Sequence, residues 1–358
     1  MKILDKYIIK NFLGTFFLAL ALFVLVAVVF DISEKIDEFI EKSAPINEIF
    51  FDYYLNFTIH YANLFSSLIV FISVIFFTSR LAFNSEFIAI INSGVSFFRL
   101  MFPYFIAATV ITAMSIYLAN NLIPTTNKAR IDFEFNYLKQ KPKSRFSNLH
   151  RQILPDHYIF FTTYNTNRNI GYNFSYEVFD GPQLKSKLNA DYLRWDTIKN
   201  KWILENYLIR NFVNNKEFLL KGTRLDTNIA LSPKDLSNQV YSVESMKLQE
   251  LNNFIKNERA RGSDTVKYFE IEKHQRFSYP FATYILTLIA VSLSARKPRG
   301  GIGINIAAGI GIAFAYILFM KIAVTFAING NLLPAIAVWI PNIIFGIISL
   351  GLYNNAPK

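Results

Sequence analysis

Six long apolar runs constrain what this chain can fold into more than any other feature of its sequence. Each run has at least 19 residues and contains no Asp, Glu, Lys or Arg. At about 1.5 Å of rise per residue, a helix of that length reaches about 29 Å, which matches a bilayer core of roughly 30 Å. The sequence therefore predicts six transmembrane helices, at residues 12–30, 57–79, 100–123, 277–295, 302–320 and 332–353.

The composition agrees with a membrane protein. Hydrophobic residues make up 52% of the 358 residues and charged residues only 18%, whereas soluble domains average about 25% charged residues. This balance excludes an ordinary soluble enzyme and a disordered chain. The absence of Cys excludes thiol catalysis, Cys-ligated zinc, iron–sulfur clusters and a disulfide-stapled secreted domain.

The first apolar run has a second interpretation, a cleavable signal peptide preceded by Lys2, Lys6 and Lys10. The hydrophobic region of a signal peptide has about 7–15 residues, and this run is longer. No small-residue cleavage site follows it, because the chain continues directly into the sequence DISE at residues 31–34. We therefore expect a retained membrane anchor.

The charges of the short loops predict the orientation. Net charge is +2 over residues 1–11, +1 over 80–99 and +3 over 296–299, but −5 over 31–56. Positive short loops face the cytoplasm, so both termini are expected there and residues 124–274 outside. That long segment carries a net charge of +7, which long domains tolerate when they are translocated. Its outward position argues against a nucleic-acid partner.

The segment between the two sets of three helices has the pattern of a β domain. Runs rich in aromatic and β-branched residues, with turn signals between them, predict strands at residues 157–163, 173–179, 184–193 and 201–208. Residues 244–260 have a helical pattern that ends at Arg261-Gly262. The predicted fold is an α-helical membrane protein with six transmembrane helices, arranged three plus three, and an inserted all-β jellyroll domain.

Three regions follow from these elements. Residues 1–123 hold the first three helices, residues 124–274 form the outward β domain with its trailing helix, and residues 275–358 hold the last three helices.

Motifs for catalysis are missing from the sequence. It contains no G-x-x-x-x-G-K-[ST], no H-E-x-x-H and no G-x-S-x-G. His150 and His157 are the only His pair near enough in sequence to suggest a shared metal, and no further ligands surround them. We therefore expect no metal site, no cofactor bound by this chain, and no enzymatic activity of its own.

A short segment between the second and third runs is the most informative part of the predicted cytoplasmic side. Asn84 or Ser85 suits a helix start, and Gly94 suits the position just past a helix end. The two turns between them are too short to span a membrane, and Glu86 lies near the positive end of the helix dipole. The segment at residues 83–94 is either a plain interfacial helix or a coupling helix that docks into a motor subunit.

Three other features of the helices have open interpretations. Lys321 follows the fifth run and Lys35 follows the first, and each is a candidate contact for an anionic lipid headgroup. The alternative for Lys321 is that its side chain simply extends to the membrane interface. The alternative for Lys35 is an ion pair with Asp31. A stripe of small residues lets another helix approach closely, within the chain or from a partner. The stripe consists of Gly303, Ala307, Gly311 and Ala315.

The chain resembles the LptF/LptG permeases of the lipopolysaccharide-export ABC transporter over essentially its whole length. The most specific match is Ser85-Glu86 followed by the sequence SGVS at residues 93–96. Further matches are the sequence LDKYI at residues 4–8, HQRF at residues 274–277 with Pro280, and Trp195, Trp202, Leu204 and Asn206 in the β domain. The Gly-rich start of the fifth run resembles the LptG branch.

The resemblance implies a transport role in the inner membrane of a Gram-negative bacterium. Two paralogous permeases, LptF and LptG, would enclose a cavity for lipopolysaccharide, and an LptB-like ATPase dimer, which binds the ATP and Mg, would drive its closure. LptC-like and LptA-like proteins would carry the lipid onward across the periplasm. By the same resemblance Glu86, Ser85 and Gly94 would lie at the ATPase contact, and Lys35 and Lys321 would meet lipid A phosphates.

Two alternatives belong to other functional classes. A glycolipid-processing enzyme of the envelope would need convergent carboxylates or a metal site. A membrane-anchored receptor with a β sensor domain would not need an acid-bearing capped helix between the second and third runs.

Overall fold

The chain forms two compact units in the computed structural model. Unit 1, the membrane unit, combines Met1–Tyr137 with Glu270–Lys358, and unit 2, the β unit, is Leu138–Phe269. The inserted unit thus begins at Leu138 and not at residue 124, because the third apolar run continues as helix to Tyr137. The structure describes residues 2–138, 145–165, 168–197, 199–213, 216–233, 236, 243–260, 262–263, 265–295, 302–330 and 332–356.

Helices build the membrane unit, and in its described part six stretches are long and apolar enough to cross a membrane. This confirms the six predicted spans. The helical elements are α1 (Ile3–Glu41), α2 (Ile46–Glu48), η1 (Ile49–Tyr54), α3 (Leu55–Leu64), α4 (Ser66–Phe83), α5 (Glu86–Asn92), α6 (Phe97–Tyr117), η2 (Leu118–Leu122), α7 (Ile123–Tyr137), α11 (Val266–Ser294), α12 (Ile302–Asn329) and α13 (Pro334–Asn354).

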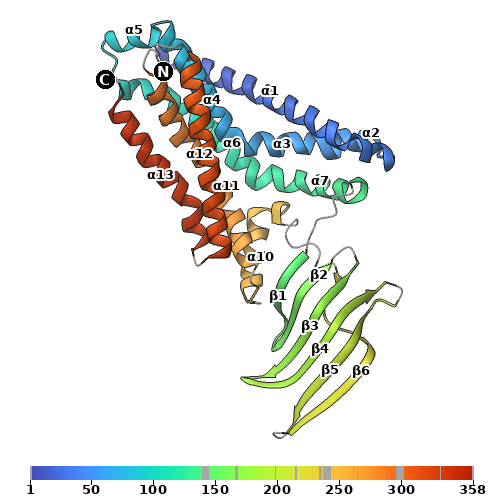
Figure 1. Ribbon diagram of the computed structural model, residues 1–358. Coiled ribbons are helices and arrows are strands. Elements are labelled where there is room, and N and C mark those ends of the chain that lie inside the picture. Colours follow the sequence, from blue (N-terminus) through green and yellow to red (C-terminus); the bar gives the residue numbers. More distant parts are fainter. Residues whose placement is uncertain are drawn as a thin grey trace. The chain divides into compact units, whose positions relative to one another are not determined.

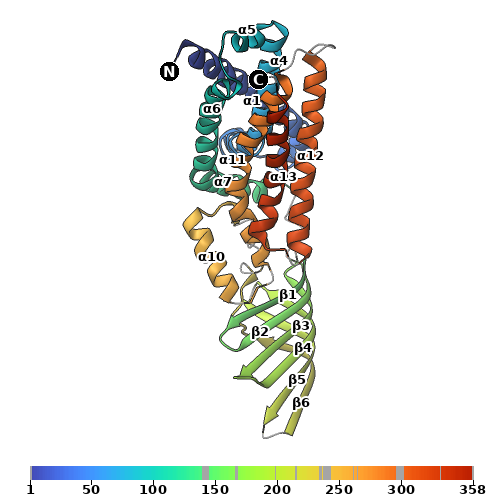
Figure 2. The ribbon, with the colours of Figure 1, turned by 90° about the vertical axis from the view of Figure 1, so that its left-hand side faces the viewer.

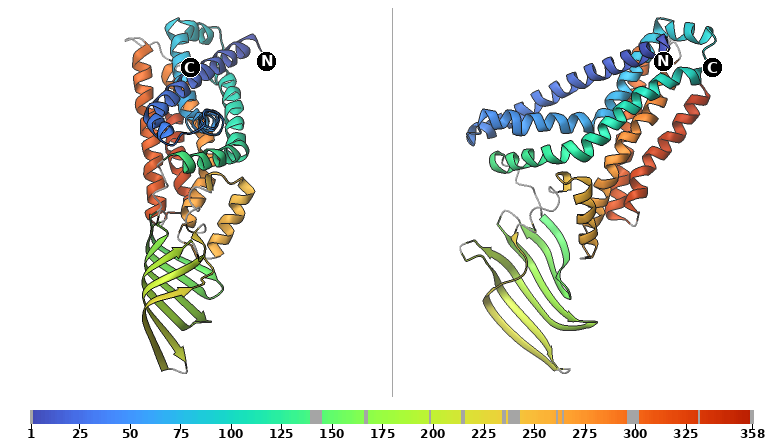
Figure 3. Two further views of the ribbon diagram at one scale, coloured as in Figure 1. Left: turned by 90° about the vertical axis from the view of Figure 1, so that its right-hand side faces the viewer. Right: turned by 180° about the vertical axis from the view of Figure 1, so that it is seen from behind.

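Two of these spans change direction along their length. The second span divides at Phe65, whose φ of −94° and ψ of 2° separate α3 from α4. The third span passes through η2, a π-helical turn, and such turns redirect a helix. As a result α3 runs beside the second half of α1, and α7 runs beside α3 (Figures 1 and 3). We call η1, α3, α7 and the second half of α1 the arm.

Aromatic rings fill the interior of the arm. Phe39 of α1 lies 5.9 Å from both Tyr53 of η1 and Phe133 of α7, measured between ring centroids. The rings of Tyr53 and Phe133 are themselves 5.3 Å apart. Edge and tilted contacts of this kind are favourable beyond the apolar area they bury, so this cluster holds the three elements together.

The rest of the membrane unit is a bundle centred on α4. In Figure 2, α12 and α13 lie side by side, and α12 also contacts α4. Gly309 of α12 allows a close approach, because a Cβ atom there would lie 2.2 Å from Cδ1 of Ile75 on α4. The core of the bundle comprises, among others, Phe12, Phe16, Val70, Phe71, Val74, Tyr104, Leu286 and Ile289.

Buried polar pairs join the helices of the bundle. The hydroxyls of Thr78 and Tyr104 are 3.0 Å apart, and Asn305 Nδ2 donates to Ser79 Oγ at 3.0 Å. Asn342 Nδ2 donates to the carbonyl of Ser278 at 2.9 Å. Hydrogen bonds between helices fix which faces meet in a lipid environment, where the apolar effect gives little discrimination.

The β unit contains a six-stranded antiparallel sheet in sequential order from β1 to β6. The four predicted strands are confirmed as parts of β2 to β5, whereas β1 and β6 were not predicted, because polar and charged residues dominate their sequences. The bounds are β1 (Arg145–Leu154), β2 (His157–Asn165), β3 (Ile170–Asp180), β4 (Gln183–Asp196), β5 (Lys201–Val213) and β6 (Lys216–Thr227). The predicted turn at residues 214–215 lies outside the described residues.

One face of the sheet carries the core of the β unit. Phe161, Phe174 and Leu204 are fully or almost fully buried there. Trp202 is also fully buried, and its Nε1 donates to the carbonyl of Leu231 at 2.7 Å, which fastens the segment after β6 over this face.

Helix α10 (Leu248–Ala260) is fixed to the sheet by a buried ion pair. It is the helix predicted at residues 244–260, and Gly262 with φ +64° follows its end. Glu258 Oε1 lies 2.7 Å from Arg151 Nη2 of β1, with side chains 0% and 7% exposed. Breaking a buried pair leaves an uncompensated charge, which costs several kcal/mol.

We predict that Glu258→Ala destabilises the β unit by about 3–5 kcal/mol. Trp fluorescence during urea unfolding of the full chain measures this in a Trp339→Phe background, where only Trp195 and Trp202 of the β unit report. The control is Glu205→Ala, which removes an exposed pair with Arg194 and should cost under about 1 kcal/mol. Equal losses for the two variants would contradict a special role of the buried pair.

Candidate functional site

The short helix α5 crosses one end of the bundle, where it connects α4 to α6 beside the two ends of the chain (Figure 1). Its bounds are Glu86–Asn92, seven residues, or about 10 Å of helix. It is therefore too short to span a membrane, as the sequence predicted.

Local backbone geometry sets both ends of α5. Gly94 has φ +88° just past the helix, and its N–H donates to the carbonyl of Ile91 at 3.0 Å. This is the predicted position for a left-handed glycine. The predicted start is corrected in one respect: Ser85 is the N-cap residue with φ +64°, but its side chain makes no capping hydrogen bond.

A single aromatic side chain anchors α5 to the bundle. Phe87 is 0% exposed and belongs to the bundle core. Its ring centroid lies 6.2 Å from that of Phe97 on α6, which in turn lies 5.4 Å from that of Tyr353 on α13. Ile88, Ala89 and Asn92 on the other side of the helix are exposed. The helix thus has one fixed face and one free face.

Glu86 stands at the start of α5 with both carboxylate oxygens engaged. Tyr7 Oη of α1 donates to Oε2 at 3.1 Å, and Asn84 Nδ2 donates to Oε1 at 3.2 Å. Both contacts lie at the surface, and Glu86 remains partly exposed. The carboxylate is therefore held in place while its charge stays available to a partner.

A two-point ion pair fixes the neighbouring ends of α1 and α6. Arg99 Nη1 lies 2.8 Å from Asp5 Oδ1, and Arg99 Nη2 donates to Asp5 Oδ2 at 2.9 Å. The backbone N–H of Lys2 also donates to Asp5 Oδ2, at 2.9 Å. Two parallel bonds define an orientation as well as a distance. Sequence reasoning counted Arg99 only as a loop charge, because no local signal links positions so far apart.

Lys35 lies inside a polar cluster of the arm. Its Nζ lies 2.7 Å from Asp31 Oδ1, the predicted i,i+4 pair. Tyr53 Oη of η1 donates to Asp31 Oδ2 at 3.0 Å, and Lys35 donates to Tyr53. The side chains of Lys35 and Asp31 are only 15% and 11% exposed. The pair is thus largely buried within the arm.

Lys321 has a different environment. It is exposed and is the only charged residue in the sequence of α12. No contact recorded for the described residues joins it to the Lys35 cluster.

Most of the small-residue stripe of α12 faces away from the bundle, and only its last member, Ala315, packs against the core. Gly303, Ala307 and Gly311 are exposed, and Ala315 is half-buried. A Cβ atom at Gly303 or Gly311 would meet nothing within 4 Å. A neighbouring row, which sequence reasoning missed, makes the contacts inside the chain; its buried members are Asn305, Gly309, Ala313, Tyr316 and Met320. The stripe is therefore left open to a partner.

The two histidines considered for a metal take part in separate contacts. His157 Nδ1 lies 2.6 Å from Tyr176 Oη, and the His150 ring stacks near Tyr158 with centroids 6.0 Å apart. The described residues include no group of three or more His, Cys, Asp or Glu that could hold a metal ion.

A family model described as the lipopolysaccharide export system permease LptF/LptG matches residues 6–355. The match spans both units and confirms the resemblance found in the sequence. The model covers LptF and LptG together, so the preference for LptG stays a prediction. The comparison with curated proteins gave no match.

We predict that Phe87→Ala costs about 3–5 kcal/mol and releases α5 from the bundle. Hydrogen exchange of the amides at residues 86–92 measures this, and exchange should speed up in the variant. Ile88→Ala is the matched control, because the side chain of Ile88 is 39% exposed. Amide exchange at residues 86–92 in that variant should stay near the wild-type rate. Equal protection in both variants would mean that Phe87 is not the anchor.

Proposed function

The chain belongs to the LptF/LptG family of lipopolysaccharide export permeases, and from this premise we propose that it extracts lipopolysaccharide from the inner membrane as one half of a permease pair. A separate dimeric ATPase of the LptB type binds the ATP and Mg²⁺ and drives the cycle. The chain itself performs no catalysis. Both termini and α5 face the cytoplasm, and the β unit faces the periplasm, as the loop charges predict.

The observation that carries this proposal is the fixed short helix α5 with its anchored carboxylate. A coupling element must move with the helices it controls, so it has to be rigid on one face and accessible on the other. Phe87 supplies the fixed face, and Glu86 presents a charge held by Tyr7 and Asn84. Closure of the ATPase would then reach α4 and α6 as rigid-body motion. Ser85 and Gly94 set the two ends of this contact.

The open stripe on α12 supports pairing with a paralogous permease. Gly303, Ala307 and Gly311 leave a surface that another helix can approach closely. In the most apolar stretch of α1, only 11% of the residues are buried within the chain. Helix α1 therefore also has a large surface free for lipid or a partner helix. The lipid cavity would lie between the two permeases.

Lys321 and Lys35 are the proposed contacts to lipid phosphates. Lys321 supports this role better, because it is exposed in a helix with no other charge, and a charge at membrane depth is costly unless it meets a partner. Lys35 would first have to exchange its bond to Asp31 for a phosphate.

The edge of the sheet supports transfer of the lipid to periplasmic bridge proteins of the LptC and LptA types. Within the described sheet β6 is an edge strand, and Phe218, Leu219 and Leu220 on it are all more than half exposed. An exposed apolar edge is a surface on which another strand can pair.

We predict that Glu86→Arg loses the ATPase. Tagged wild type purified from host membranes should bring an ABC ATPase and a second six-span permease. Glu86→Arg should bring the second permease but not the ATPase, because a reversed charge no longer complements a surface that binds a carboxylate. Glu34→Arg makes the same charge change on an exposed part of α1 remote from α5 in sequence, and it should retain both partners.

Two further outcomes decide the coupling role. Glu86→Gln keeps an acceptor for Tyr7 and should weaken ATPase association less than Glu86→Arg does. Wild type that purifies without an ATPase would overturn the transport assignment, and an ATPase retained by Glu86→Arg would overturn the role of Glu86.

We predict that Lys321→Gln weakens binding of bisphosphorylated lipid A by about ten-fold, as expected for a lost hydrogen bond to a charged group. Native mass spectrometry of the permease pair measures the bound fraction. Lys321→Arg should bind nearly as well as wild type. The loss should vanish with lipid A from which the phosphates have been removed; an equal loss with that lipid would mean that Lys321 does not contact phosphate.

A further inference from the structure

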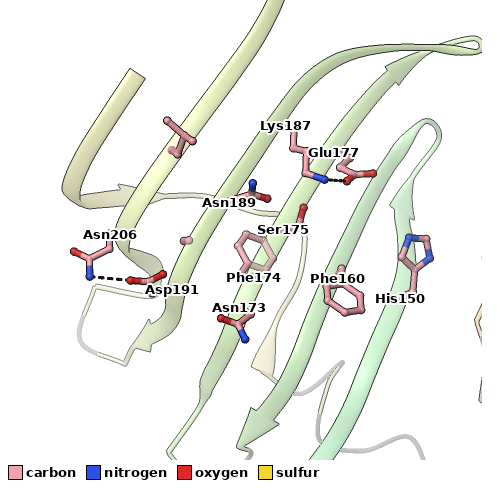
Figure 4. A pocket seen from close by; sticks show the side chains of 12 residues that line it. His150, Phe160, Asn173, Phe174, Ser175, Glu177, Lys187, Asn189, Asp191 and Asn206 are labelled. Atoms are coloured by element: carbon pink, nitrogen blue, oxygen red, sulfur yellow. Dashed lines mark hydrogen bonds and ion pairs between the residues drawn. The ribbon is translucent and has the colours of Figure 1, made fainter. Parts of the chain in front are cut away.

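A groove of about 500 Å³ lies along one face of the β sheet. Its lining comes from five consecutive strands, β1 to β5. Figure 4 shows its principal side chains, which are His150, Phe160, Asn173, Ser175, Glu177, Lys187, Asn189, Asp191 and Asn206. Its volume is within the usual range for small-molecule sites, about 300–1,000 Å³.

Cross-strand register places polar side chains opposite one another in this groove. Glu177 of β3 pairs with Lys187 of β4, and Ser175 pairs with Asn189. The Lys187 Nζ and Glu177 Oε1 atoms are 2.7 Å apart. Apolar residues share the lining with these polar positions, namely Phe174, Ala190 and Leu208.

Two asparagines with left-handed backbone conformations flank Asp191 on the neighbouring strands. Asn173 of β3 has φ +49° and Asn206 of β5 has φ +53°. Asn206 Nδ2 donates to Asp191 Oδ2 at 3.0 Å (Figure 4). Left-handed residues inside strands re-aim side chains at a small energetic cost and often lie at functional sites.

The face that β4 turns toward the core changes near Asp191. Ala190 and Leu193 are both buried although they are three positions apart, whereas a regular strand would place them on opposite faces. The polar row of Asn173, Asp191 and Asn206 thus crosses β4 where that strand changes face.

Hydrogen-bonding groups in the groove remain available to a ligand. In the part of the chain that the structure describes, Ser175 Oγ is buried without a hydrogen-bond partner. Asn189 lies opposite Ser175 on β4, and Asn173 lies two positions before Ser175 on β3. Neither amide is joined by a dashed line to another side chain drawn in Figure 4. An amide both donates and accepts, and so does a hydroxyl, which makes this set complementary to a molecule rich in hydroxyl groups.

The charge of the groove disfavours an anion. Glu177 and Asp191 bring two negative charges and Lys187 one positive charge, so the formal sum is one negative. A phosphate or carboxylate would meet like charge here. Phe160 adds an aromatic ring to the lining, and a few placed polar groups with an aromatic surface are typical of a small-molecule site.

We propose that this groove binds neutral sugar rings of the exported glycolipid, a proposal that rests on the export function above. Ser175, Asn189 and Asn173 hydrogen-bond the hydroxyls, and Phe160 packs against a sugar face. The groove would hold the polar part of the lipid while the rest of the molecule lies elsewhere.

Saturation-transfer NMR on the full chain in detergent tests the groove. The probe is core oligosaccharide released from host lipopolysaccharide by mild acid and then dephosphorylated. Wild type should show saturation transfer, and Asn189→Ala and Ser175→Ala should each raise the Kd about three- to ten-fold, as for one lost neutral hydrogen bond. Asn211→Ala is the matched control, since Asn211 lies on β5 outside the groove, and it should bind like wild type.

Each other outcome overturns the proposal. These outcomes are no saturation transfer with wild type, an equal loss in Asn211→Ala, and binding of only the phosphorylated oligosaccharide. Lipid A without core sugars should not compete with the probe; competition would assign the groove to that part of the lipid instead. Ser175→Ala removes only one oxygen, so its result stands even if Asn189→Ala unfolds in the Trp fluorescence assay.

The test separates this proposal from the export function, because it uses the single chain without an ATPase. Glu86→Arg should bind the oligosaccharide like wild type. A chain that recruits the ATPase but binds no oligosaccharide overturns the groove alone, whereas a chain that binds oligosaccharide but recruits no ATPase overturns the export function and leaves a sugar-binding groove.

Discussion

The need to pair every backbone N–H and C=O inside a membrane is the constraint on which the rest of unit 1 depends. It makes the six apolar runs helical but does not say which faces meet, because lipid is as apolar as the side chains. A small set of buried polar contacts supplies that choice. Asn305 to Ser79 joins α12 to α4, and Asn342 to the carbonyl of Ser278 joins α13 to α11. Gly309 then brings α12 close to α4.

The same logic explains why α5 is a firm element although it has only seven residues. A helix of that length has little stability alone. Phe87 ties it to the bundle core, and the Asp5–Arg99 pair fixes the ends of α1 and α6 beside it. The hydrogen bond from Tyr7 to Glu86 then joins α1 to α5. Three helices therefore share one fixed end, which is the mechanical requirement for passing on a motion applied at α5.

Sequence patterns predicted what depends on near neighbours. The spans, strands β2 to β5 and the place of Gly94 follow from run length, alternation and one backbone angle. What they missed depends on contacts between distant positions. The break at Phe65 lies against Phe23 of α1, the role of Arg99 needs Asp5, and the choice between the two faces of α12 needs Ile75. Each of these involves a partner on another helix.

The same relation between burial and charge pairing holds inside each of the two units. Inside each unit, charges that pack are paired: Asp31 with Lys35 in the arm, and Arg151 with Glu258 in the β unit. Removing one partner of such a pair leaves a buried charge, so stability constrains these residues. Glu86 and Lys321 differ, because each keeps an exposed part. The proposed contacts at Glu86 and Lys321 are of this second kind, since a contact that forms and breaks in each cycle has to be reached by its partner.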